Sequence, residues 1–111
     1  MIHFLNLHPG PFKNIKSGKK DVEMRLYDDK RRLIKVDDQI TFTNNQTGET
    51  LSCTVLDIKV FKNFEALYSS YNKTRIGYEE WEDANPEDMK QYYPEDEMQS
   101  NGVCAIEIKL N

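Results

Sequence analysis

Residues 51–61 read LSCTVLDIKVF, the longest stretch of the sequence that is typical of a β-strand. Its apolar residues change phase midway, with one parity before the change and the opposite parity after it: Leu51, Cys53 and Val55, then Leu56, Ile58 and Val60. A strand that gains one residue in this way contains a β-bulge, and bulges bend sheets toward barrels. The stretch therefore predicts one long strand with a bulge or sharp bend between Val55 and Leu56.

Shorter strand-like and helix-like stretches surround this strand. Alternating or continuous apolar residues predict further strands, which are residues 2–7, 21–27, 36–44 and 102–110. Helical turns are predicted within residues 8–18, 63–71 and 85–93, the last two with Asn63 and Asn85 as N-caps. The pattern favours a mixed α/β, β-rich fold, a small barrel of about five strands with short helices, over an open parallel sheet.

The length of 111 residues predicts a single domain spanning residues 1–111. No stretch approaches the roughly 18 apolar residues of a membrane helix, and the first residues lack the features of a signal peptide, so a cytoplasmic location is expected. Cys53 and Cys104 fall in predicted strands and are expected to be buried, reduced thiols. No cofactor is expected, and no metal site, because His3 and His8 have no third ligand at a suitable spacing.

Charge is distributed unevenly along the chain. Residues 12–35 hold nine lysines and arginines against four acids, whereas residues 37–111 hold six against fifteen. A chain with this asymmetry can carry a basic patch although its net charge is −4. Ordinary solvated faces explain the same charges, so the distribution alone does not decide between a nucleic-acid partner and none.

The stretch SGKKDVEMR, residues 17–25, is the main candidate site. Alternation places Glu23 and Arg25 on the face opposite Val22, about 7 Å apart, and Lys20 reaches them from the preceding turn. A glutamate can accept from an amine or ring N–H of a planar ligand, while the two cations hold a phosphate or carbonyl oxygen. The alternative is a surface strand of ion pairs, worth less than about 1 kcal/mol.

Residues 12–44, FKNIKSGKKDVEMRLYDDKRRLIKVDDQITFTN, resemble the ASCH domain, a family of the PUA-like superfamily. The family's Gly-x-Lys-x-x-Glu-x-Arg pattern is matched by Gly18, Lys20, Glu23 and Arg25. The sequence departs from the family at a Gly-Asp turn, where Asp37 stands in place of the glycine. Aspartate tolerates the left-handed conformation better than most residues, so the turn is expected to survive.

The resemblance implies a PUA-like pseudo-barrel of five to six strands, with a cleft between barrel and helices that the Lys-Glu-Arg strand lines. It also implies binding of RNA or a modified nucleoside. Within this reading Tyr27 shares the parity of Glu23 and Arg25 and is a candidate to stack on a base, and Lys30, Arg31 and Arg32 are candidates to contact an RNA backbone.

Two other functions remain open. One bacterial branch of the family hydrolyses N(4)-acetylcytidine with a Lys, a Thr three residues later and a remote Glu; here Lys20 fills the first place and Glu23 replaces the Thr. Lys20 and Glu23 are then the candidate acid/base pair, with Glu87 or Asp88 as the remote acid. The other alternative is a protein-interaction module that uses the acidic residues 79–97, where Trp81 is expected to be a packing anchor.

Overall fold

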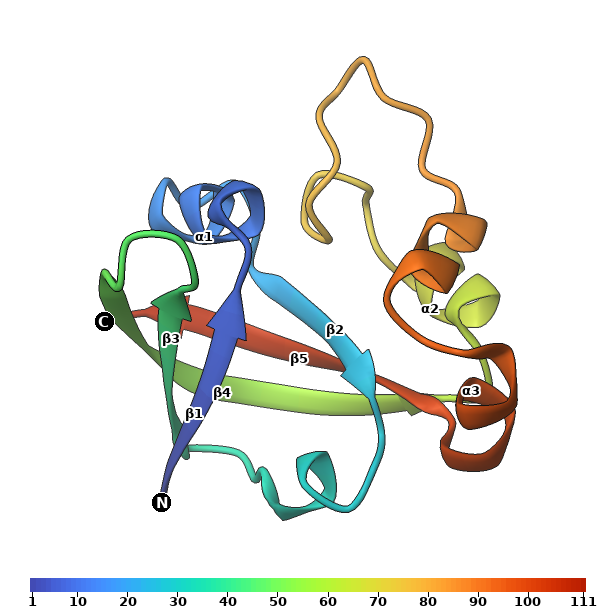
Figure 1. Cartoon of the computed structure of the whole chain (residues 1–111), viewed down its shortest axis with the longest axis horizontal. Coiled ribbons are helices and arrows are strands. Elements are labelled where there is room, and N and C mark those ends of the chain that lie inside the picture. Colours follow the sequence, from blue (N-terminus) through green and yellow to red (C-terminus); the bar gives the residue numbers. More distant parts are fainter.

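The computed structural model, which describes residues 1–111, contains one curled five-stranded sheet (Figure 1). Its strands are β1 (Ile2–Leu7), β2 (Val22–Leu26), β3 (Gln39–Asn44), β4 (Thr50–Phe61) and β5 (Val103–Leu110). They lie in the order β1-β3-β4-β5-β2. Only β1 and β3 are parallel, and the other neighbouring pairs are antiparallel. The prediction of a mixed, β-rich barrel-like fold is confirmed.

The bulge predicted in the longest strand is present. Val55 pairs with Ile108 and Asp57 pairs with Glu107, so Leu56 is the extra residue between two registers. Beyond it the predicted parity holds only in part. Ile58 packs against the core, whereas the side chain of Val60 is exposed. Because a bulge bends its strand and increases the local twist, β4 changes direction at Leu56 and follows the curl of the sheet.

Short helices connect the strands. They are α1 (Pro9–Lys16), the 3-10 turn η1 (Arg31–Leu33), α2 (Phe64–Ser70), the 3-10 helix η2 (Pro86–Gln91) and α3 (Glu95–Asn101). Asn63 and Asn85 cap α2 and η2 as predicted, accepting from the backbone N–H groups of Ala66 and Glu87. The helical turns predicted within residues 85–93 form a 3-10 helix over Pro86–Gln91. The helix α3 was not predicted from the sequence. Figure 1 shows α2 and α3 at the same end of the sheet, away from α1.

Two hydrophobic clusters join the helices to the sheet, and β5 contributes residues to both. Cys104 and Ile106 belong to the cluster that α1 covers, whereas Val103 and Ala105 belong to the cluster under α2 and η2. In the sequence, Cys104 and Ile106 share one phase of the strand, and Val103 and Ala105 share the other. β5 lies between β4 and β2 and is buried on both faces, which explains its continuous apolar run.

Two further sequence-based expectations are confirmed. Cys53 and Cys104 are free and buried. Asp37, which replaces the glycine of the family pattern, is the one non-glycine residue with positive φ, at 74°. Its turn leads into β3, so an aspartate supplies the left-handed conformation there. None of the helices combines the length and the apolarity that crossing a membrane requires.

Candidate ligand-binding cavity

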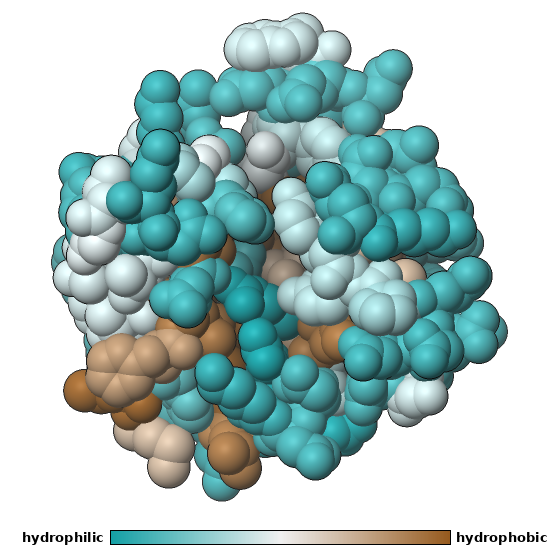
Figure 2. Space-filling model, in the orientation of Figure 1, coloured by the Kyte–Doolittle hydropathy of each residue, from teal (hydrophilic) through white to brown (hydrophobic).

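A cavity of about 560 Å³ opens between the sheet and the helices that cover it. Its walls come from the end of β1, from α1, from β2 with the turn before it, from Tyr68 of α2, and from residues 76–93. Figure 2 shows this face hollowed near its middle, with hydrophilic residues around most of the opening. The volume lies within the range of about 300–1,000 Å³ that is usual for small-molecule sites.

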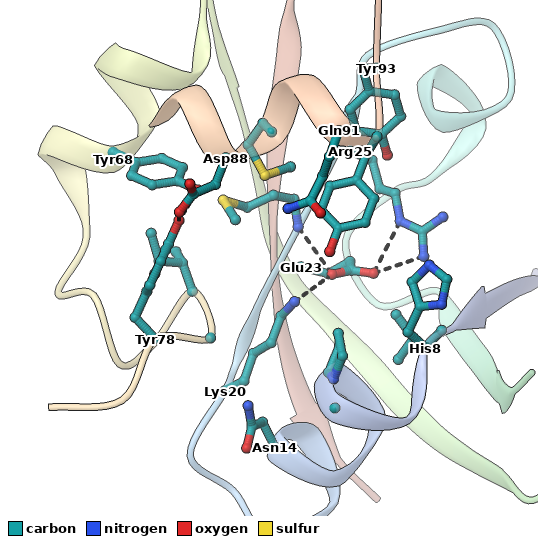
Figure 3. Close-up of a pocket in the computed structure, with 18 of the residues that line it drawn as sticks. His8, Asn14, Lys20, Glu23, Arg25, Tyr68, Tyr78, Asp88, Gln91 and Tyr93 are labelled. Atoms are coloured by element: carbon teal, nitrogen blue, oxygen red, sulfur yellow. Dashed lines mark hydrogen bonds and ion pairs between the residues drawn. The ribbon is translucent and has the colours of Figure 1, made fainter. Parts of the chain in front are cut away.

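Lys20, Glu23 and Arg25 converge in this cavity (Figure 3). Glu23 Oε1 accepts from Lys20 Nζ at 2.8 Å and from the backbone N–H of Met24 at 3.2 Å. Glu23 Oε2 accepts from Arg25 Nε at 3.0 Å and Nη2 at 2.8 Å. The side chains of Lys20 and Glu23 are only 7% and 4% exposed, so this is a buried charge cluster and not a surface strand of ion pairs.

The two cations keep Glu23 ionised. Burial alone would raise the pKa of its carboxyl, but the charges and hydrogen bonds of Lys20 and Arg25 outweigh burial and lower the pKa to about 2. The pKa of Arg25 is raised, because the attraction of Glu23 exceeds the opposing effect of burial. Glu23 is therefore a carboxylate over the whole physiological range of pH.

The hydrogen bonds within the cluster determine which of its donors and acceptors remain free. Each oxygen of Glu23 already accepts two hydrogen bonds, which uses the acceptor capacity of the carboxylate. Lys20 gives Glu23 one of its three N–H donors, and Nη1 of Arg25 makes no hydrogen bond within the protein. The donors of Lys20 and Arg25 are available in the cavity wall, while Glu23 orients them.

Tyrosines and an acid form the facing part of the cavity. The Tyr78 hydroxyl donates to Asp88 Oδ2 at 2.7 Å and lies 2.9 Å from the Tyr68 hydroxyl. Burial and these two hydrogen bonds raise the pKa of Tyr78, which stays protonated. Figure 3 shows this group across the cavity from Glu23. Of the two late acids predicted for the site, Asp88 lines the cavity, whereas Glu87 pairs with Lys90 at 2.6 Å on the surface.

The two histidines have separate environments. His8 lines the cavity, and its Nδ1 lies 3.1 Å from the side-chain amide of Asn45. His3 lies outside the cavity and contacts Asp38 at 2.8 Å. No group of three or more His, Cys, Asp or Glu residues is arranged to hold a metal ion.

Besides Glu87, four predicted site residues do not line the cavity. The Arg32 guanidinium lies 4.4 Å from the centre of the Tyr27 ring, so the arginine covers the ring that was expected to stack on a base. Arg31 pairs with Asp28 at 3.2 Å. Lys30 is exposed. These residues adjoin η1, beyond the end of β2 that is farther from Lys20.

Sequence reasoning missed several lining residues. Tyr68, Gly77, Gln91, Tyr92 and Tyr93 all line the cavity, and none of them is a site residue predicted from the sequence. The recurrence of tyrosine where leucine or phenylalanine would pack as well was the available signal, since tyrosine keeps a polar group at the edge of an apolar wall. The expectation that Trp81 is a packing anchor is wrong, because its side chain is 80% exposed.

Comparison with known proteins agrees with this architecture. The family model of the ASCH domain matches residues 5–110. The hypothetical protein PH0355 has a similar crystal structure, with a TM-score of 0.85 and 31% sequence identity over 100% of both chains. The solution structure of PF0455 from Pyrococcus furiosus has a TM-score of 0.77 and 29% identity, covering 99% of this chain and 97% of that one.

A more distant structure shares the fold. ASCH from Zymomonas mobilis has a TM-score of 0.68 and 20% identity, covering 97% of this chain and 66% of that chain. No curated protein is significantly similar in sequence.

Proposed function

Because the chain belongs to the ASCH domain family and its charge cluster lies in a cavity of suitable size, we propose that it binds a nucleobase-bearing ligand there. The ligand is a modified nucleoside or a base within RNA. In this proposal Lys20 and Arg25 donate to acceptors on the base, and Glu23 holds both cations in place.

The observation that carries the proposal is the set of unused N–H donors on Lys20 and Arg25. Carbonyl oxygens and unprotonated ring nitrogens are the acceptors that a base presents at its edge. The surrounding tyrosines supply flat faces, and stacking on an aromatic ring is worth about 1–3 kcal/mol per base. Tyr93 and Arg25 both line the cavity, so a stacking face and a donor occur together.

Hydrolysis of an acylated nucleoside is the second candidate, with Lys20 and Glu23 as the acid/base pair. A carboxylate with a pKa of about 2 is a weak general base at neutral pH, which favours binding over catalysis by Glu23. Asp88 and Glu82 are the other carboxylates in the cavity lining. Release of acetate from N(4)-acetylcytidine distinguishes the two candidates.

Thermal unfolding with a panel of nucleosides tests the proposal. Cytidine, uridine, adenosine, guanosine and N(4)-acetylcytidine are the probes, since a ligand bound only by the folded state raises the melting temperature. We expect Lys20→Met to abolish the shift produced by the best probe, because it removes a donor but keeps the length of the side chain.

Lys13→Met is the matched control, since Lys13 is exposed on α1 and does not line the cavity. It should retain the full shift. The proposal is wrong if no probe shifts the wild type, or if both variants respond as the wild type does.

A further inference from the structure

The chain segment that contributes one wall of the cavity is rich in negative charge. Between Arg75 and Lys90 the chain holds no lysine or arginine but six acids, which are Glu79, Glu80, Glu82, Asp83, Glu87 and Asp88. Two of them, Glu82 and Asp88, line the cavity directly. We call residues 79–88 the acidic segment.

The cations of the cavity do not offset this charge. The lining contains two cations, Lys20 and Arg25, and three carboxylates, Glu23, Glu82 and Asp88. Outside the lining, Lys19 pairs with Glu79 at 3.4 Å and Lys90 pairs with Glu87 at 2.6 Å. Lys73 Nζ donates to the backbone carbonyl of Glu82 at 2.7 Å, but neither the Glu82 nor the Asp88 side chain forms an ion pair. The part of α1 that lines the cavity is uncharged.

The basic residues at η1, which are Lys30, Arg31 and Arg32, do not line the cavity. Arg31 is bound to Asp28, and Arg32 covers Tyr27, so two of the three residues predicted to contact an RNA backbone are engaged within the protein. Phosphates attached to a base in the cavity would lie within reach of the lining carboxylates of Glu82 and Asp88. Like charges that face one another weaken binding and reject the wrong partner.

We propose that the cavity selects an unphosphorylated nucleoside or free base, and that the acidic segment excludes nucleotides and RNA. This inference rests on the proposed function and narrows it to one class of ligand. The donors of Lys20 and Arg25 recognise the base, while the phosphate of a nucleotide meets uncompensated carboxylates at the opening.

Trp81 provides a direct readout of this selection. It is the only tryptophan in the chain, it is 80% exposed, and it lies in the acidic segment next to the lining residue Glu82. Fluorescence titration therefore reports on the opening itself, and isothermal calorimetry provides the affinities. The probes are the best nucleoside from the thermal panel, its 5′-monophosphate and a single-stranded trinucleotide that contains it.

We expect the nucleoside to bind at least tenfold more tightly than the monophosphate, and the trinucleotide to bind more weakly still. Equal or tighter binding of the monophosphate or the trinucleotide would overturn the inference but leave the proposed function in place. If the trinucleotide binds with a salt dependence that the triple change of Lys30, Arg31 and Arg32 to alanine reduces, the protein is an RNA-binding module. Failure of all three probes would overturn both proposals.

A charge-neutralised variant tests the cause. Glu80 and Asp83 are exposed, make no ion pair and do not line the cavity. We expect the double variant Glu80→Gln, Asp83→Asn to bind the monophosphate at least threefold more tightly and the nucleoside as the wild type does. The control, Asp96→Asn with Glu97→Gln, changes the net charge equally on the exposed surface of α3. Equal gains in both variants would show that net charge alone, and not the acidic segment, repels the phosphate.

Discussion

Glu23 is a buried carboxylate whose four accepted hydrogen bonds come from two cations and one backbone N–H. Removing one partner of a buried ion pair commonly costs about 3–5 kcal/mol, because it leaves a buried charge without its counter-ion. We therefore expect Glu23→Gln to lower the free energy of unfolding by about 3 kcal/mol or more, measured by urea denaturation.

Glu87→Gln is the control for that measurement. Glu87 and Lys90 form an exposed pair, and such pairs contribute less than about 1 kcal/mol. Similar small losses in the two variants would contradict a buried, structurally required Glu23.

The lowered pKa of Glu23 predicts that the free energy of unfolding falls at acidic pH. The pKa of Glu23 is lowered from 4.5 to about 2 on folding, so the unfolded chain binds the proton more readily. Stability from Glu23 is complete above pH 4.5 and is lost as pH falls toward 2. Asp38, whose pKa is lowered to about 2 chiefly by its hydrogen bond to His3, titrates in the same range. We expect the urea midpoint of Glu23→Gln to fall less steeply than that of the wild type over this range, and equal slopes would contradict the assignment.

At the scale of elements, the loop between α2 and η2 is built around a glycine that contacts the site. Gly77 has a φ of +113°, and a Cβ added there would lie 3.4 Å from Lys20 Cδ. We expect Gly77→Ala to destabilise the fold by about 1 kcal/mol or more, through strain at a positive φ. It should also weaken nucleoside binding, because the backbone that shifts to relieve this strain lies in the cavity wall beside Lys20. Urea denaturation and calorimetry measure the two effects.

Gly48→Ala separates strain from contact. Gly48 has a comparable φ of +78°, but a Cβ there has no neighbour within 4 Å. This variant should lose stability and keep its affinity for the nucleoside. Equal losses of affinity would mean that Gly77 does not position Lys20.

Elements with strong local patterns were predictable, and elements set by tertiary contacts were not. The five strands and the bulge at Leu56 follow from apolar phase, and α2 follows from its cap and stripe. The α3 sequence, EDEMQSN, has no apolar stripe, and Met98 is its only side chain that packs against a core cluster. The convergence of Lys20, Glu23 and Arg25 was anticipated from spacing, but the facing wall comes from residues 76–93, whose approach no local pattern encodes.

At the scale of the whole molecule, the order β1-β3-β4-β5-β2 leaves β1 and β2 at opposite edges of the sheet. Curling of the sheet brings these edges together near the cavity, where Arg25 Nη2 donates to the backbone carbonyl of Asn6 at 2.8 Å. The bulge in β4 contributes to that curl. Arg25 thus joins the two edges and at the same time holds Glu23, so closure of the barrel and construction of the site depend on one side chain.

Arg25→Lys tests this coupling while preserving the positive charge. An ammonium lacks the planar fork with which the guanidinium reaches Glu23 and Asn6 together, so the variant keeps at most part of the connection. We expect β1 amides to exchange with deuterium several-fold faster, and β5 amides, which lie between two strands, to remain protected.

Arg75→Lys provides the comparison, because Arg75 pairs with Asp21 on a more exposed surface and does not contact β1. Its exchange pattern in β1 should match that of the wild type. If Arg25→Lys also leaves β1 exchange unchanged, the hydrogen bonds of β1 to β3 suffice to hold that edge. Arg25 would then serve the cavity alone, and closure of the sheet would have to come from the packing of α1 and the core beneath it.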